Sequence, residues 1–251
     1  MIVFSVLFIS LLMAEIFYPY RNRVLLRMQR WPGNLLLIFI DSLLLKLILP
    51  AGLFVVSIWA SEQKIGFLNY FELQGSFTYI LSFIFLDMMI YFQHVFSHKW
   101  NILWRFHGVH HSDLDLDVTS GLRFHPVEIL YSLMFKICLI LFIGIDKNVI
   151  LVFEIVLNGM SMFSHSNVKL PASFEKYLRY IFVTPQMHII HHSVQENESN
   201  TNFSFNFSIW DNLFKTYSEK FKSDGVIGYL KFNKSEDQTI SQLLSQPFRE
   251  S

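Results

Sequence analysis

Long apolar stretches separated by short polar connections make up most of the first 163 residues. The first runs from Met1 to about Tyr18, the second from about Leu35 to Trp59, and the third from about Phe77 to Phe96. Each is close to the ~20 mostly apolar residues that a helix needs to cross a bilayer. The fourth, from Val127 to about Phe163, is too long for one span and is interrupted near Gly144, so it predicts a hairpin of two helices. The pattern predicts an all-α fold, an integral membrane helical bundle.

Basic residues orient this bundle. Four arginines crowd the connection after the first apolar stretch: Arg21, Arg23, Arg27 and Arg30. The positive-inside rule places that connection in the cytoplasm. The connection from Ser61 to Ser76 has no basic excess and fits the opposite side. The first stretch lacks a basic leader and a small-residue cleavage site, so we predict a retained helix rather than a signal peptide.

The composition agrees with a membrane protein and narrows its partners. Hydrophobic residues make up 52% of the chain and charged residues only 16%. The formal net charge of +0 and the lack of a long basic run exclude nucleic acid as a partner. Cys138 is the only cysteine and lies in an apolar stretch, which excludes both a disulfide framework and a cysteine metal cluster.

All ten histidines lie between positions 94 and 192. Eight of them form three clusters: His94 and His98; His107, His110 and His111; His188, His191 and His192. Residues three and four apart share one face of a helix, so each cluster would present its imidazoles to a common point. A single histidine pair is more often structural than metal-binding, but three clusters with no histidine elsewhere predict a metal site.

The predicted topology brings these histidines to one side of the membrane. The third apolar stretch would deliver His94 and His98 to its cytoplasmic end. The hairpin would keep His125 and His165 on the same side, and no further crossing precedes the last cluster. We therefore predict a cytoplasmic histidine-rich helical cap on the bundle.

The number and type of ligands indicate the chemistry. Eight or more imidazoles are too many for one ion, because a zinc site closes at four ligands, so two ions are predicted. Imidazole binds iron, zinc, copper and nickel. At a membrane interface the reachable substrates are lipids, and oxidation of an unactivated C–H bond calls for oxygen at a redox metal, so iron is expected.

Two other functions stay open. Zinc, the possible alternative metal, would suit a zinc-dependent lipid hydrolase, although no His-Glu-x-x-His motif occurs in the sequence. A membrane metal-handling protein would need ligands along a transmembrane path, whereas these ligands cluster at one end.

Six motifs between residues 77 and 217 carry the strongest signal. They are Asp87-Met-Met-Ile-Tyr91-Phe-Gln-His94-Val-Phe-Ser-His98, Leu103-Trp104-Arg105-Phe106-His107-Gly-Val-His110-His111-Ser112, Arg123-Phe124-His125-Pro126-Val-Glu128, His165-Ser-Asn167, His188-Ile-Ile-His191-His192-Ser193 and Trp210-Asp211-Asn-Leu-Phe214-Lys-Thr-Tyr217. In their order they resemble the fatty acid hydroxylase superfamily, which includes sterol desaturases and alkylglycerol monooxygenase. The sequence departs from the family pattern at Val95, where an arginine is frequent, and at Lys215, where a glycine is usual.

The resemblance implies a membrane di-iron oxygenase that hydroxylates or desaturates a lipid. Its metal ligands would be His94, His98, His107, His110, His111, His188, His191 and His192, with His125 and His165 as additional ligands. It implies two iron ions, O2 as co-substrate and no catalytic residue beyond the ligands. No cytochrome b5-like domain occurs in the sequence, so electrons would come from a separate donor protein.

We predict three parts: N-terminal transmembrane helices (1–76), a catalytic domain (77–217) and a polar C-terminal tail (218–251). The lack of a retrieval signal and of a fused haem domain fits a bacterial inner membrane, with the endoplasmic reticulum as the eukaryotic alternative. Asp87 would either orient a ligand histidine, pair with Arg105 or Arg123, or serve a structural pairing. Glu128 would either bond a ligand imidazole or mark a helix start near Pro126.

Overall fold

The computed structural model describes residues 2–249, and its regular elements are helical throughout that range. The α-helices are α1 (Ile2–Phe17), α2 (Arg27–Ile48), α3 (Gly52–Glu62), α4 (Phe67–Tyr70), α5 (Ser76–Lys99), α6 (Asn101–His111), α7 (Pro126–Ile143), α8 (Lys147–His165), α9 (Ala172–Leu178), α10 (Pro185–His191), α11 (Glu196–Ser199), α12 (Ile209–Leu213) and α13 (Ile240–Arg249). Short 3-10 helices occupy Ser120–Leu122, Leu230–Phe232 and Ser235–Gln238. The predicted all-α fold is confirmed.

Four segments are long and apolar enough to cross a membrane. They are Arg27–Tyr70, which comprises α2 to α4, and the helices α5, α7 and α8; the apolar α1 is shorter, with 16 residues. Their outer faces are exposed: Phe77 and Phe142 keep 75% and 76% of their surface accessible. Apolar surface on this scale belongs against lipid. The chain is thus a multi-pass integral membrane protein.

The second apolar stretch differs from its predicted form. It starts at Arg27, eight residues before the predicted start, and it breaks between α2 and α3. Pro50 lies at the break and has no backbone N–H to continue the helix. Gly52, which starts α3, has a φ of +67° that favours glycine. Both helices pack against α7, but α2 also contacts α13, whereas α3 contacts α8.

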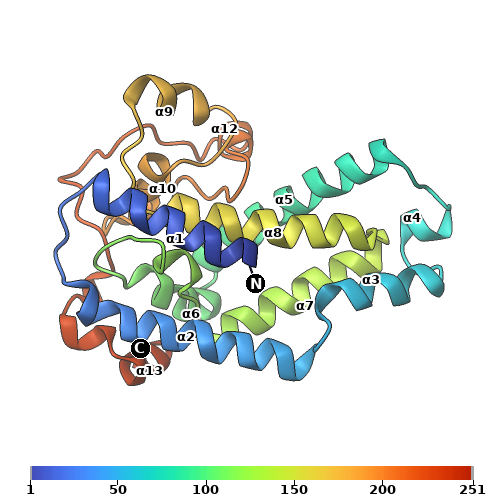
Figure 1. The fold of residues 1–251 in the computed structure, drawn as a ribbon, viewed down its shortest axis with the longest axis horizontal. Helices are drawn as coiled ribbons and strands as arrows, with labels where there is room; N and C mark the ends of the chain where they lie inside the picture. The colour runs from blue at the N-terminus through green and yellow to red at the C-terminus, as the bar shows by residue number, and fades with distance from the viewer. Residues whose placement is uncertain (1, 250–251) are drawn as a thin grey trace.

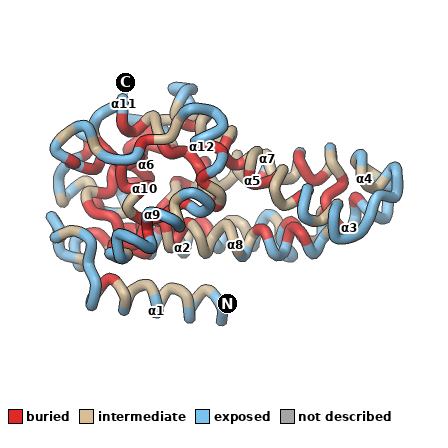
Figure 2. Tube along the Cα trace, turned by 90° about the horizontal axis from the view of Figure 1, so that it is seen from above, coloured by how far each residue is buried: buried red, intermediate tan, exposed pale blue. Residues whose placement is uncertain are grey.

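The spans lie along the long axis of the molecule and end in two different regions (Figure 1). At one end are α4 and the turn between α7 and α8; at the other are α6, α10 and α13. Buried residues concentrate around α6 and α10, whereas α1 and α4 are mostly exposed (Figure 2). The core between the spans contains Leu86, Ile140 and Phe153. The compact end, which carries the histidines, is thus held at the tip of the membrane bundle.

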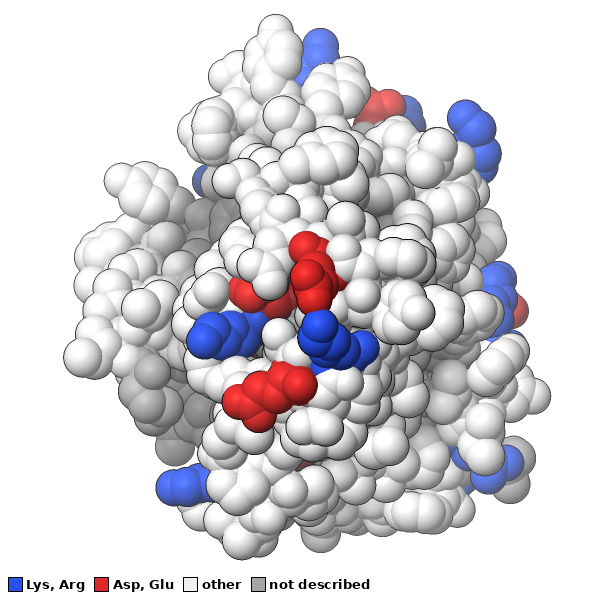
Figure 3. Space-filling model, turned by 90° about the vertical axis from the view of Figure 1, so that its right-hand side faces the viewer, with Lys and Arg blue, Asp and Glu red and all other residues white. Residues whose placement is uncertain are grey.

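The α4 end is sparsely charged. A small group of acidic and basic side chains lies in the middle of this face, and other charged side chains appear mainly near its edge (Figure 3). Lys64 and Glu72 form an exposed ion pair there, with 2.6 Å between Nζ and Oε1. The mixed charge agrees with the absence of a basic excess between Ser61 and Ser76.

The described part of the polar C-terminal segment, residues 218–249, packs on the histidine-rich end. Helix α13 contacts α6 and α2, and Leu243 is fully buried with Leu37 and Val109. The polar side chains are used inside: Gln238 accepts from Arg123 at 2.6 Å, and Gln246 accepts from Ser112 at 2.9 Å. Some polar side chains of this segment thus form buried hydrogen bonds, while others are exposed to solvent.

Arg30, predicted to lie in a connection, is instead a fully buried residue of α2. Its guanidinium donates to Asp113 at 2.7 Å and to Asp117 at 2.9 Å. Arg123 belongs to the same network, because its Nη1 lies 3.5 Å from Oδ1 of Asp113. Its Nε donates to the carbonyl of Val109 in α6 at 3.0 Å. Two arginines and two aspartates therefore tie α2 to the loop that follows α6.

Candidate metal centre

Four helices deliver the clustered histidines. His94 and His98 lie one turn apart near the end of α5, and α6 carries the next cluster in its last turns. The third cluster lies on α10, with His192 at its C-cap, and His165 is the last residue of α8. The helical spacing predicted for all three clusters is confirmed.

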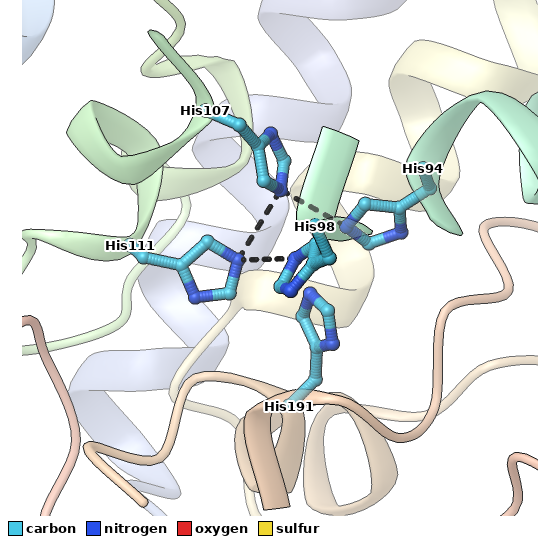
Figure 4. Close-up of side chains that lie close together, drawn as sticks. All are labelled: His94, His98, His107, His111 and His191. Carbon is cyan, nitrogen blue, oxygen red and sulfur yellow. Dashed lines mark hydrogen bonds between the residues drawn. The ribbon is translucent and has the colours of Figure 1, made fainter. Parts of the chain in front are cut away.

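The side chains meet in two groups. In each group the candidate ligand atoms lie within 4.8 Å of one another. The first group is His94, His98, His107, His111 and His191 (Figure 4), and the second is His110, His165, His188 and His192. Helices α6 and α10 each contribute to both groups, so the two sites share their supports and lie side by side.

Hydrogen bonds donated to backbone carbonyls set the tautomer of four of these rings. A carbonyl oxygen can only accept, so the Nδ1 atom facing it must carry the proton. The four bonds are His94 to Phe203 (2.6 Å), His110 to Arg123 (3.2 Å), His165 to Ser161 (2.7 Å) and His191 to Thr201 (2.8 Å). Each of these neutral rings therefore presents a bare Nε2 lone pair.

The carboxylate of Glu128 sets the tautomer of His107 in the same way. Its Oε1 lies 2.6 Å from His107 Nδ1, which leaves the Nε2 of that ring free as well. A carboxylate behind a metal-binding imidazole fixes the ring and raises its basicity. Of the two roles predicted for Glu128, the structure supports the contact with a ligand imidazole, although the residue also lies in the first turn of α7.

The lone pairs face each other at distances that suit a bound cation. His94 Nε2 lies 3.1 Å from His107 Nε2, and His110 Nε2 lies 3.0 Å from His165 Nε2. Neither atom of these pairs carries a proton, so the contacts are repulsive between acceptors rather than hydrogen bonds. A cation between them would turn this repulsion into coordination. The donor set therefore fits one metal ion in each group.

Burial keeps these rings neutral, as metal binding requires. Burial lowers the pKa of His191 to about 3, and it holds the pKa values of His110, His111 and His192 well below the usual range. Across residues 2–249, His191 Nε2 and both ring nitrogens of His192 have no protein partner. At neutral pH these imidazoles are uncharged, and each keeps one nitrogen lone pair that can bind a metal ion.

His125 lies outside both groups. Its Nδ1 accepts from the backbone N–H of Val127 at 3.2 Å and thereby caps α7. Its Nε2 lies 3.3 Å from the carbonyl of Leu244, to which it must donate. Both nitrogens are thus engaged, and of the two additional ligands that the resemblance implied, only His165 joins a group.

Two acidic residues act through the loop that follows α11. Asp87 accepts from the indole of Trp210 at 2.8 Å and from the backbone of Phe207 at 3.1 Å, which is the structural pairing among its predicted roles. Asp211 accepts from the backbone N–H groups of Phe203 and Ser204. It holds the loop whose carbonyl orients His94. The Trp-Asp motif signalled this residue, but only the structure shows its role.

A cavity of about 290 Å³ reaches from the first histidine group into the bundle. Helices α2, α5, α7 and α8 line it, and His94 and His107 lie in its wall. Apolar residues such as Leu45, Leu53 and Leu133 form the part within the spans. A substrate in this cavity would touch both the membrane interior and the candidate metal centre.

Gly121 offers a direct test of how the second group is supported. A Cβ at this position would clash with the carbonyl of Ser161, which accepts from His165 at 2.7 Å. We expect Gly121→Ala to destabilise the protein by about 1–3 kcal/mol and to weaken metal binding by the second group. Thermal unfolding in detergent and metal content per chain would measure both effects.

Gly108→Ala is the matched control, because a Cβ there meets no atom closer than 3.4 Å. It lies in α6 among the histidines and should keep the metal content of the wild type. Equal behaviour of the two variants would contradict the proposed support of His165 by Ser161.

Comparison with known proteins identifies the region that carries these motifs. The family described as Fatty acid hydroxylase matches residues 79–216. The ornithine lipid hydroxylase OlsE of Rhizobium tropici is 32% identical over 142 residues, which cover 57% of this chain and 42% of that protein. Alkylglycerol monooxygenases are also similar: that of Danio rerio is 30% identical over 61% of this chain, and that of Homo sapiens is 28% identical over 56%.

These matches span 42%, 33% and 30% of the respective relatives, so the chain corresponds to less than half of their length. No solved structure matches the chain significantly.

Proposed function

This chain belongs to the fatty acid hydroxylase family, and we propose that it is a membrane di-iron oxygenase that hydroxylates a C–H bond of a lipid with O2. The observation that carries the proposal is the pair of buried imidazole groups whose lone pairs converge on two neighbouring points. Nine imidazoles exceed what one zinc ion binds, which disfavours a hydrolase with a single zinc ion. Their position at one end of the spans disfavours a transport path.

Separate sets of residues would bind the metal ions, orient the ligand rings and bind the lipid. The group of five and the group of four histidines would each hold one ion, and the bound iron pair would supply activation of O2. Glu128 and the carbonyls of Phe203, Ser161 and Thr201 orient the ligand rings and keep their protons on the far nitrogen. The apolar cavity wall would hold the lipid beside the first group and exclude bulk water. Hydroxylation and desaturation both begin at such a site, and the position of the bound chain would decide between them.

The proposed setting follows from the membrane helices and the charges. We place the protein in a bacterial inner membrane with the histidine-rich end in the cytoplasm, because the connection between α1 and α2, which contains Arg21 and Arg23, lies at that end of the spans (Figure 1). The names of the relatives support a lipid as substrate, with an ornithine lipid and an alkylglycerol as the first candidates to test. Electrons would come from a separate donor protein.

Metal analysis combined with oxygen consumption tests this function. The protein would be purified in detergent from iron-supplemented cells, and reductant-dependent O2 uptake would be followed with and without total lipid extract. We expect two iron ions per chain and lipid-dependent uptake, with a hydroxylated lipid detected by mass spectrometry. Stoichiometric zinc after iron supplementation, with no O2 uptake, would overturn the proposal.

Glu128→Gln tests the support of His107. The amide oxygen can still accept from Nδ1, but the negative charge behind the imidazole is lost. We expect metal affinity or O2 uptake to fall by about 10–100-fold, as for other outer partners of metal-binding histidines. Glu72→Gln, at an exposed ion pair in the connection before α5, is the control and should behave like the wild type. An unchanged iron affinity in Glu128→Gln would remove Glu128 from the metal centre.

A further inference from the structure

Asp41 is a buried carboxylate within a membrane span. It lies on α2, is 5% exposed, and neither of its carboxylate oxygens has a hydrogen-bond partner within residues 2–249. An unpaired acid at membrane depth is costly, and such residues commonly face a cavity and contact a ligand. Asp41 has no part in the histidine network described above, so a carboxyl group at this position in the bundle requires another explanation.

Its surroundings are the cavity that leads to the first histidine group. Asp41, Glu128 and His107 all line this cavity. Glu128 lies near enough for its charge to act on Asp41, and its Oε2 is also without a partner among the described residues. Three carboxyl oxygens without a partner, two of Asp41 and one of Glu128, are therefore available in the cavity that His107 also lines.

The charges of the cavity wall do not balance. Among the described residues that line the cavity, Lys136 is the only lysine or arginine. Its Nζ lies 2.8 Å from Oε1 of Glu154, so its charge is already paired. This leaves the carboxyl groups of Asp41 and Glu128 without a basic partner in a partly apolar space. Two such carboxyl groups in a low-dielectric cavity favour a bound cation, which would hold them ionised, and disfavour a phosphate or carboxylate.

An uncharged hydrocarbon chain would leave these oxygens unsatisfied. A primary ammonium group carries three N–H donors and a positive charge, so it would satisfy the oxygens of Asp41 and the free oxygen of Glu128 together. Such a group can enter from the bilayer if an apolar chain follows it into the part of the cavity lined by Leu45 and Leu53.

We propose that the cavity binds the amine-bearing end of a lipid, with Asp41 as the counter-charge of the amine. The inference deepens the proposed function and rests on it for the reaction, since it names the substrate class. Because His94 and His107 lie in the same cavity wall, the oxidised carbon belongs to the polar end of the lipid rather than to the end of its hydrocarbon tail.

Binding to the metal-free protein tests this without depending on oxygenase activity. The probes are octadecylamine and its N-acetyl derivative, which has the same chain but no charge. Wild-type protein in lipid nanodiscs should bind the amine about tenfold more tightly or better, as expected for a charged hydrogen bond. Asp41→Asn should lose this preference with little change toward the acetylated probe, and Asp41→Glu should keep part of it.

Stability gives a second readout. Asp41→Asn replaces an unpaired buried carboxyl group with an uncharged amide of the same shape, so its unfolding temperature should equal or exceed that of the wild type, and a loss of amine binding cannot then be ascribed to misfolding. Asp224→Asn, which changes an exposed aspartate outside the cavity, is the control and should leave binding unchanged.

The outcomes separate the two proposals. Equal binding of the two probes by wild-type protein would overturn the inference, as would an amine preference that survives in Asp41→Asn. An equal loss of affinity for both probes in that variant would also overturn it, since Asp41 would then shape the cavity without distinguishing a charged ligand from an uncharged one. An amine preference that depends on Asp41, in an iron-loaded protein that consumes no O2 with any lipid, would sustain the binding site and refute the oxygenase.

Discussion

Replacing His110 with alanine is expected to abolish lipid oxygenation and to lower the iron content from two ions per chain to about one. His110 belongs to the group of four, and its Nε2 lies 3.0 Å from that of His165. With three histidines left, the second ion loses a ligand at a site that needs both ions. Loss of a metal that stabilises developing charge costs several kcal/mol, which corresponds to a fall in rate of about a thousandfold or more.

His125→Ala is the matched control for this experiment. His125 follows α6 in sequence and lies on the same end of the molecule, but both its nitrogens bond to the backbone. We expect this variant to keep two iron ions and most of the O2 uptake, with a loss of about 1 kcal/mol in stability because the cap of α7 is removed. Full activity in His110→Ala, or loss of one ion in His125→Ala, would show that the ligands are assigned wrongly.

Replacing Arg30 with methionine is expected to produce the largest loss of stability. The side chain keeps much of its length, but Asp113 and Asp117 remain buried without their main counter-charge. Breaking a buried pair by removing one partner costs about 3–5 kcal/mol. Because the same network holds the loop of Arg123, whose carbonyl orients His110, the variant should also lose metal from the second group.

Thermal unfolding in detergent would measure this loss, with Arg23→Met as the control at an exposed arginine of the same segment. Burial by itself raises the pKa of Asp113, but Arg30 and Arg123 beside it outweigh burial and hold the pKa well below the usual range. The stability that the ion pair between Arg30 and Asp113 contributes is therefore present at neutral pH. It is lost only in acid, as the pH falls below the ordinary pKa of a carboxyl group. A variant as stable as the wild type at neutral pH would show that the network contributes nothing to folding.

Sequence reasoning placed the apolar segments well and their boundaries less well. The spans were visible because lipid exposure demands runs of apolar residues, which can be read without knowing the neighbours. The start of α2 was missed, because Arg30 has the composition of a loop residue and becomes a helix residue only through its burial against Asp113 and Asp117. The packing of residues 218–249 could not be predicted for the same reason, since Gln238 and Gln246 look exposed until their partners are known.

Local periodicity, apolar length and residue type are properties of neighbouring residues, so the sequence by itself determined the helical membrane fold, the clusters of candidate imidazole ligands and the family. Only the tertiary structure decided how those ligands divide into two groups, that His165 joins them while His125 caps a helix, and that Asp41 faces the cavity beside His107. These outcomes depend on how α2, α5, α6, α8 and α10 pack, and residues far apart in the chain set the direction of each side chain. Spacing along one helix shows which residues share a face, and packing between helices decides what that face meets.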